Sequence, residues 1–380
     1  MRFLHLSDLH LGKNLCGYSL LTDQRTALDD ALRIAHENCV NAIVLAGDIY
    51  DKSIPSEEAI QLYDGFLRGA EERGIPVLCV SGNHDSAERL AFGASLMRSA
   101  GYWVSPVYDG NVCSVVLRDE FGTVNFYLLP FLKPVQVRRF FPDAQIESYT
   151  EAVKLALSTM NLDLSERNVL ITHQYVRGSL CSEPDFSVGG IDQVDGSVFA
   201  DFDYTALGHI HGAQAVAGEC VRYAGSIVPC SFSECGQVKS ATLVELGEKG
   251  CVSVKLVPLH QLHGMQKLCG TYMELVAREF YSAIICDDYM QVTLMDEEDV
   301  PGAFDRLRLI YPNLMQLLYD NCRQRMQQAL DSDALPEKER TPLDWLDELF
   351  RLQNNREMSE EERQMAQTLL EQCKKEDEMS

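Results

Sequence analysis

The chain has 380 residues, of which 46% are hydrophobic, and it carries a formal net charge of −24 at pH 7. This length predicts one large domain with one or two smaller additions, because it exceeds what one ordinary core supports. No uninterrupted apolar run reaches about 18 residues, which excludes a conventional membrane-spanning helix. The acidic charge argues against tight nonspecific nucleic-acid binding by this chain alone, since that binding depends on Lys and Arg beside phosphates. Many of the acidic residues lie after Asp287, so the N-terminal region can still present a local basic surface, and the net charge does not exclude a nucleic-acid substrate.

The sequence opens with a strand-like run at 2–7 and shows no basic or apolar leader, so we expect a cytoplasmic protein. The 13 cysteines form an odd number with no C-x-x-C pair, which predicts reduced and mostly buried thiols. A zinc site built from Cys220, Cys230 and Cys235 is the alternative, although their spacing matches no common zinc motif.

Short β runs alternate with amphipathic helical segments in the first part of the chain. In order, they are a strand at 2–7, a helix near 23–37, a strand at 42–46, a helix near 56–73 and a strand at 76–80. This alternation is typical of an α/β sheet. The runs within 112–129 and 241–259 are shorter and joined by turns, as in antiparallel strands. We therefore predict an α/β fold in which a two-sheet β-sandwich is flanked by helices.

The pattern changes after about His263. A helix near 272–280, a strand at 289–295, a helix near 301–310 and a strand at 314–319 predict a small α/β domain. From about Asp331 the chain is charged and helical, with an apolar stripe that a partner would cover. The predicted organisation is a large domain at 1–264, a capping domain at 265–330 and a C-terminal helix-loop-helix at 331–380.

Five short polar motifs stand where apolar strand runs are predicted to end. They are Asp8-Leu9-His10, Gly47-Asp48-Ile49-Tyr50-Asp51, Gly82-Asn83-His84-Asp85, His173 and Gly208-His209-Ile210-His211. Side chains at the carboxyl ends of strands converge on one crevice. Five of the nine histidines belong to these motifs, whereas we expect the others to have ordinary structural roles; those are His5, His36, His260 and His263.

The motifs offer nitrogen and oxygen ligands without a thiolate, which suits manganese, iron or zinc in octahedral-like coordination. Two metal ions about 3.5–4 Å apart can share one carboxylate, activate a water and hold both sides of a phosphoryl displacement. Asp48 is the predicted bridging ligand.

The ordered series D-x-H, G-D-x-x-D, G-N-H-D, H and G-H-x-H resembles the calcineurin-like metallophosphoesterase superfamily. The resemblance implies one metal ion held by Asp8, His10, Asp48 and His211, and a second held by Asp48, Asn83, His173 and His209. It implies that His84 binds no metal and stabilises or protonates the leaving oxygen, with the Asp51 carboxylate orienting its ring. For Asp85, a turn-stabilising role and a direct role remain equal alternatives.

Further blocks are similar to the SbcD family of nuclease subunits within this superfamily. They include Arg89-Leu90, residues 202–211 with Gln214, Ser231-Phe232-Ser233-Glu234 and Tyr311-Pro312-Asn313. The likeness covers nearly the whole chain and weakens from about Asp331, and Ile227 stands where the family often has proline. It implies a double-strand DNA exonuclease and single-strand or hairpin endonuclease that uses two divalent ions, with manganese favoured.

The same resemblance implies a homodimer joined to the SMC-like ATPase SbcC in a heterotetramer for DNA repair, recombination and replication-fork processing. The C-terminal stripe is the expected SbcC contact, because amphipathic helices commonly dock into partner grooves. Packing of the stripe on its own domain is the alternative; its residues are Leu343, Trp345, Leu346, Leu349, Phe350 and Leu352. Arg89, Arg177 and Lys133 are candidate contacts with DNA phosphates, although a lone surface cation is usually only solvated.

Two other functions stay open at this stage. A small-molecule nucleotide phosphodiesterase or phosphatase of the same superfamily would use the same ligands, although such enzymes rarely need the long extension that follows His211. A scaffold that has lost its metal chemistry would keep the fold, although every expected ligand is present.

Overall fold

The computed structural model of the protein describes residues 1–181, 192–321, 358 and 363. The chain divides into two compact units, the first comprising Met1–Lys267 and Asp287–Met290, the second Leu268–Cys286 and the chain from Gln291 onward. The predicted helix-loop-helix at 331–380, with its stripe from Leu343 to Leu352, lies outside the described residues apart from positions 358 and 363. None of the described helices combines the length and apolarity needed to cross a bilayer.

Two six-stranded sheets form the first unit, and the predicted two-sheet α/β sandwich is confirmed. One sheet has the order β14-β13-β1-β4-β5-β6 and the other β11-β12-β10-β9-β8-β7. The first contains β1 (Arg2–Leu6), β4 (Ala42–Ala46), β5 (Val77–Val80), β6 (Tyr102–Val104), β13 (Ser240–Leu246) and β14 (Val252–Pro258). The second contains β7 (Cys113–Asp119), β8 (Gly122–Leu129), β9 (Arg167–His173), β10 (Tyr204–Gly208), β11 (Gln214–Ala215) and β12 (Val221–Tyr223). A short hairpin, β2 (Asn14–Leu15) with β3 (Tyr18–Ser19), follows β1.

Alternating side chains of the two sheets meet in one core. Phe3 and Val44 of the first sheet share it with Phe126 and Ile171 of the second. The rings of Phe3 and Phe126 lie edge to face, with centroids 5.6 Å apart. Since every second residue of a strand faces the same way, the apolar runs bury the inner faces of both sheets.

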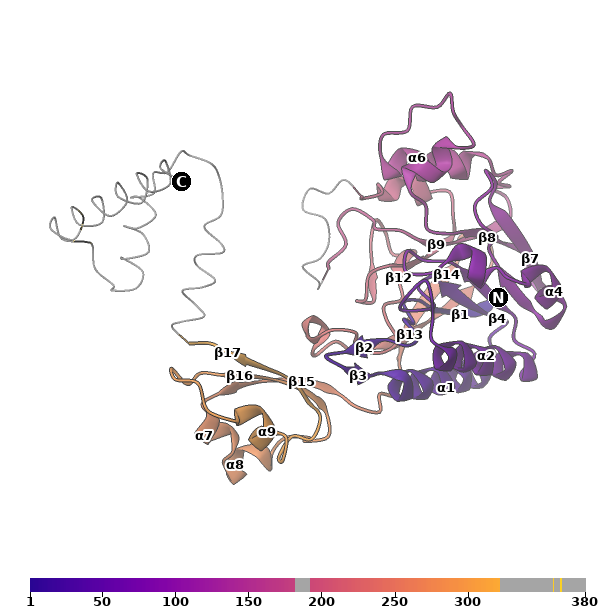
Figure 1. The fold of residues 1–380 in the computed structure, drawn as a ribbon. Helices are drawn as coiled ribbons and strands as arrows, with labels where there is room; N and C mark the ends of the chain where they lie inside the picture. Colours follow the sequence, from indigo (N-terminus) through magenta and orange to yellow (C-terminus); the bar gives the residue numbers. More distant parts are fainter. Residues whose placement is uncertain (182–191, 322–357, 359–362, 364–380) are drawn as a thin grey trace. The chain divides into compact units, whose positions relative to one another are not determined.

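Helices cover the outer faces of the sandwich (Figure 1), with α1 (Leu21–Glu37) and α2 (Glu57–Glu72) on one side and α6 (Tyr149–Ser158) on the other. Tyr63 of α2 contacts Cys79 of β5, and Ala152 of α6 shares a core with Leu170 of β9. The Ser56 side chain caps the start of α2, which satisfies an amide that the helix leaves free. Shorter helices are α3 (Ala87–Leu90), α4 (Ala94–Met97) and α5 (Pro134–Arg138).

The second unit is built on a three-stranded sheet of order β15-β16-β17. It contains α7 (Tyr272–Leu275), α8 (Arg278–Tyr281), α9 (Ala303–Leu307) and β17 (Leu314–Tyr319). It also contains all but the first residues of β15 (Met265–Gly270) and β16 (Tyr289–Leu294), which begin in the first unit. The single helix predicted at 272–280 is two short helices, because Ala277 between them is extended, with φ −68° and ψ 133°. Leu275, Leu307 and Leu314 are fully buried in this unit.

All eleven described cysteines are free thiols. The expectation that most of them are buried is wrong, since only Cys79 and Cys230 are buried. The exposed ones lie in turns, loops or the edge strand β15, where apolar neighbours in sequence do not guarantee burial; they are Cys16, Cys39, Cys181, Cys251 and Cys269.

Candidate metal centre

The five polar motifs lie together because the strands before them run in parallel. β1, β4 and β5 pair in parallel, and so do β9 and β10, where Gly208 stands beside His173. Main-chain hydrogen bonds join the loops, from Asp8 N to Gly47 O at 3.1 Å and from His10 N to Asp48 O at 3.0 Å. The predicted crevice at the carboxyl ends of the strands is thus formed by loops of both sheets.

Two glycines permit the close approach of these loops. A Cβ atom on Gly208 would lie 1.9 Å from Ala46 O, and one on Gly82 would lie 2.1 Å from Asp48 Oδ1. Both distances are far below any real contact, so each position requires glycine.

Four of the predicted ligands have backbone conformations that side chains usually avoid. The φ angles are 51° at Asp8, 43° at His10, 49° at Asp48 and 110° at His209. Such residues cost about 1–3 kcal/mol each and concentrate at functional sites. The surrounding sheets therefore hold these side chains in place at the expense of backbone strain.

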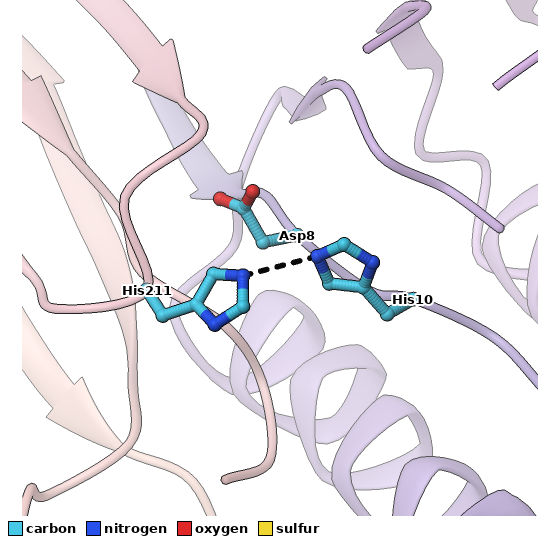
Figure 2. A group of neighbouring side chains, drawn as sticks. All are labelled: Asp8, His10 and His211. Carbon is cyan, nitrogen blue, oxygen red and sulfur yellow. Dashed lines mark hydrogen bonds between the residues drawn. The ribbon is translucent and has the colours of Figure 1, made fainter. Parts of the chain in front are cut away.

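Asp8, His10 and His211 form one half of the centre (Figure 2), with ligand atoms within 4.8 Å of one another. His10 Nε2 lies 3.1 Å from His211 Nε2. His10 Nδ1 is buried without a hydrogen-bond partner among the described residues, 3.9 Å from Asp51 Oδ1. Burial holds the pKa of His10 far below its usual value, so the ring is neutral and able to ligate a cation.

Asn83, His173 and His209 form the other half. Asn83 Oδ1 lies 3.0 Å from His173 Nε2 and 2.9 Å from His209 Nδ1. His173 Nδ1 donates to Ala46 O at 2.8 Å, so Nε2 is the ring nitrogen that faces the Asn83 oxygen. The surrounding oxygens favour a positive charge at Nε2, either as a proton or as a metal ion that replaces the proton. Burial lowers the pKa of His173, but the Asp48 and Asp8 carboxylates outweigh it and raise the pKa to about 9.

Asp48 lies between the two halves and is 2% exposed. Its Oδ2 is 3.3 Å from His173 Nε2 and 3.8 Å from His10 Nε2. Its Oδ1 accepts a hydrogen bond from His84 N at 2.9 Å. Burial opposes ionisation, yet the neighbouring His173 and His10 hold the Asp48 pKa well below its usual range. A carboxylate that stays charged between two ligand groups has the position expected of a bridging ligand.

The predicted partner of His84 needs correction. His84 Nδ1 donates to the main-chain oxygen of Asp51 at 2.9 Å, and the Asp51 carboxylate pairs with Lys13 Nζ at 2.9 Å. The main chain explains this, because Asp51 N donates to Leu11 O and ties the residue to the segment that carries Lys13. The main-chain carbonyl of Asp51, and not its carboxylate, therefore orients the His84 ring. His84 also lies close enough to His10 and Asp48 to offer a ligand atom.

Asp85 joins two of the loops. Its carboxylate accepts from Ile49 N at 3.1 Å, Tyr50 N at 2.9 Å and Gly82 N at 2.9 Å. Burial and the Asp48 charge raise its pKa to about 6. These contacts favour the turn-stabilising alternative for Asp85.

The three candidate DNA contacts are all exposed and lie on separate elements. Arg89 is in α3 and donates to Ser53 O at 3.0 Å. Lys133 directly precedes α5, and Arg177 lies in the loop after β9. By contrast, His5 is a core residue as expected, with its ring nitrogens 3.1 Å from Tyr204 Oη and 3.2 Å from Leu207 O.

Glu234 is a further residue of the centre that was not among the predicted site residues. Its Oε1 lies 2.9 Å from His211 Nδ1, and it is fully buried. Burial opposes its charge, but His211 and Lys239 lower its pKa to about 2. An available signal was a lone carboxylate between the apolar runs 223–230 and 241–246, where a charge requires a buried partner.

A sequence model of calcineurin-like phosphoesterases matches residues 1–213. Among solved structures, a dimetal phosphatase from Danio rerio is 13% identical, with 69% of this chain and 97% of that chain covered and a TM-score of 0.41. The protein TT1561 of Thermus thermophilus is also 13% identical, with 67% and 98% covered and a TM-score of 0.39. The family match spans more than half of the sequence and includes all seven predicted metal ligands, and the chain belongs to the calcineurin-like phosphoesterase family.

Proposed function

We propose that the chain is a DNA nuclease that hydrolyses phosphodiester bonds with two divalent ions, as a double-strand exonuclease and a single-strand or hairpin endonuclease. The observation that carries the hydrolytic part is the position of His173 Nε2, which lies within 3.3 Å of acceptor oxygens of both Asn83 and Asp48. A positive charge, supplied by a metal ion or in its absence by a proton on Nε2, satisfies these three groups together. DNA as the substrate is supported by the sequence blocks 231–234 and 311–313, which lie outside the family match.

The proposed ligands divide into two sets that share Asp48. Asp8, His10, Asp48 and His211 would hold one ion, and Asp48, Asn83, His173 and His209 the other. When bound, the ions supply an activated water and neutralise charge on the phosphoryl group. Manganese is the proposed metal, since the ligands are oxygen and imidazole nitrogen. His84 Nδ1 is committed to the Asp51 carbonyl, which leaves Nε2 to donate a proton to the leaving oxygen.

Exposure differs within the centre in a way that favours a large substrate. Asp8, Asp48 and His173 are buried at its base, whereas Asn83 and His84 are exposed at its rim. A polymer can therefore reach His84 without entering a closed cavity.

The substrate assay separates this proposal from its alternatives. Purified protein with Mn²⁺ should cleave a blunt duplex and a DNA hairpin, and should lose this activity when the metal is chelated. Turnover of a cyclic nucleotide without DNA cleavage would instead identify a small-molecule phosphodiesterase. Failure on every phosphoester would identify a scaffold.

A homodimer joined to an SbcC-like SMC ATPase completes the proposal. Ile54, Ile60 and Phe92 are exposed by 70%, 47% and 85% along one groove, and large apolar side chains at a surface often mark a protein contact. Sedimentation of the purified chain tests the dimer. A Phe92→Asp chain that sediments like the wild type would remove this groove from the proposed contact.

The C-terminal stripe, outside the described residues, is the proposed contact with the ATPase. Changing Leu346 and Phe350 to Asp should abolish co-purification with it, because losing two apolar anchors typically costs about two decades in affinity or more. Hydrolysis of a small phosphodiester should persist. Asp347→Ala with Glu348→Ala, on the polar side, is the matched control. Loss of hydrolysis in the Leu346/Phe350 variant would show that the stripe packs on its own domain.

A further inference from the structure

A buried ion pair lies directly behind His211. Glu234 is 0% exposed and Lys239 is 4% exposed, and Glu234 Oε2 contacts Lys239 Nζ. Burying two charges costs desolvation energy, and their mutual attraction often does no more than offset that cost. Stability alone therefore gives little reason for the pair.

The pair holds His211 at two points. Glu234 Oε1 accepts a hydrogen bond from His211 Nδ1 at 2.9 Å. Lys239 Nζ donates to the main-chain oxygen of His211 at 3.1 Å. The ring and the main chain of one residue are thus fixed by the same ion pair.

Glu234 is itself held by neutral groups. Ser226 Oγ donates to Oε2 at 3.1 Å, and Cys230 N donates to Oε1 at 3.2 Å. Although His211, Cys230 and Glu234 lie close enough to bind a cation, both Glu234 oxygens already accept from donors. These contacts make the group a support for His211 and not a third metal site.

The contact determines which nitrogen of His211 can bind a metal. A carboxylate only accepts, so Nδ1 carries the hydrogen and Nε2 presents its lone pair toward His10 and Asp8 (Figure 2). Metal-binding histidines usually donate their other N–H to such a group, and its loss costs about 10–100-fold in metal affinity. We infer that Glu234, held by Lys239, is the positioning residue that fixes the tautomer and orientation of His211. Glu234 lies beyond the family match, which ends at residue 213. The inference rests on the metal centre proposed above but not on DNA as its substrate.

Metal titration and histidine NMR test this inference together. In metal-free protein with ¹⁵N-labelled histidine, His211 should be the Nδ1–H tautomer. Glu234→Gln should weaken binding of one Mn²⁺ by about 10–100-fold and leave the other unchanged, since only one half of the centre uses His211. Glu219→Gln, whose side chain is 94% exposed, is the matched control and should bind both ions as the wild type does.

The outcomes separate this inference from the proposed function. A wild type that binds no Mn²⁺ would overturn the metal centre itself. A wild type that binds two ions, together with a Glu234→Gln variant of equal affinity, would overturn the positioning role alone. If Glu234→Gln does not fold, Glu234→Gln with Lys239→Met removes both charges and should show the same loss at one ion. An Nε2–H tautomer in the metal-free wild type overturns the inference without any variant.

Discussion

Strand β9 begins and ends at two buried polar clusters of opposite character. Arg167, its first residue, donates through Nη1 to Asp119 Oδ2 at 3.0 Å and to Gly247 O at 2.9 Å, and through Nη2 to Gly122 O at 2.9 Å. His173, its last residue, faces the acceptor oxygens of Asn83 and Asp48. We call these the Arg167 cluster and the His173 cluster.

The difference lies in how donors and acceptors are matched. In the Arg167 cluster, a guanidinium that only donates meets carboxylate and carbonyl oxygens that only accept, so the protein satisfies its own groups. In the His173 cluster, the oxygens of Asn83 and Asp48 share one titratable ring nitrogen, and Asp48 has a strained backbone with φ 49°. A buried polar cluster whose donors and acceptors are matched by fixed protein groups stabilises a fold, whereas one in which oxygens crowd a titratable nitrogen suits a metal ion in place of the proton.

The largest expected effect is at the His173 cluster. Asp48→Asn should reduce Mn²⁺-dependent hydrolysis of a small phosphodiester by about 10³-fold or more, because a neutral amide cannot hold two cations together. The fold should survive, since the core between the sheets is untouched. Turnover and thermal melting of the same sample measure both effects. Near wild-type turnover by Asp48→Asn would contradict the two-metal assignment.

His84→Ala should separate catalysis from metal binding in the same cluster. The variant should retain two ions per chain and turn over about 10²–10⁴-fold more slowly, as expected when a general acid is lost. Elemental analysis and steady-state rates check the two halves of this prediction. A missing ion would show that His84 is a ligand, which its proximity to His10 and Asp48 allows.

Arg167→Met should reduce stability and leave catalysis unchanged, the opposite of the two changes at the metal centre. Removing Arg167 should lower the free energy of unfolding by about 1–3 kcal/mol, because the Asp119 carboxylate keeps the Met1 ammonium group as its other charged partner but loses the guanidinium. Turnover per folded molecule should be unchanged. Denaturant melts and rates at low temperature test this, with the exposed Arg118→Met as the control. A variant of normal stability would remove the structural role of the Arg167 cluster.

The smallest expected effect is the loss of stability at low pH. The hydrogen bond from Arg167 holds the pKa of Asp119 below its usual range, so this pair stabilises the fold above the unfolded value of about 3.9. The stabilisation should disappear as the pH falls below that value, with a slope of at most about 1.4 kcal/mol per pH unit. The stability difference between wild type and Asp119→Asn should therefore shrink between pH 5 and pH 3. A constant difference would contradict this.

The sandwich and the ligand series could be predicted from the sequence because both depend on the order of apolar and polar side chains along the chain. Asp8 and Asp48 each follow a buried strand and His173 ends one, and parallel pairing brings such positions together. The family match at residues 1–213 includes all three.

The features that could not be predicted from the sequence depend on main-chain contacts or on packing between residues far apart in the chain. The orientation of His84 by the Asp51 carbonyl carries no side-chain signal, so the carboxylate appeared to be the partner. Glu234 is 23 residues from His211 and meets it only after the chain has folded back through β12. The break at Ala277 is a local backbone conformation that helical periodicity does not record.

The central claim is that the metal centre, of which the His173 cluster is one half, holds two divalent ions that share Asp48. Its most direct test is titration of metal-free protein with Mn²⁺, counting the ions bound per chain in the wild type and in Asp48→Asn. We predict two ions in the wild type and the loss of at least one in the variant, with both proteins folded. Equal binding by the two proteins, or a wild type that remains metal-free at millimolar Mn²⁺, would contradict the claim.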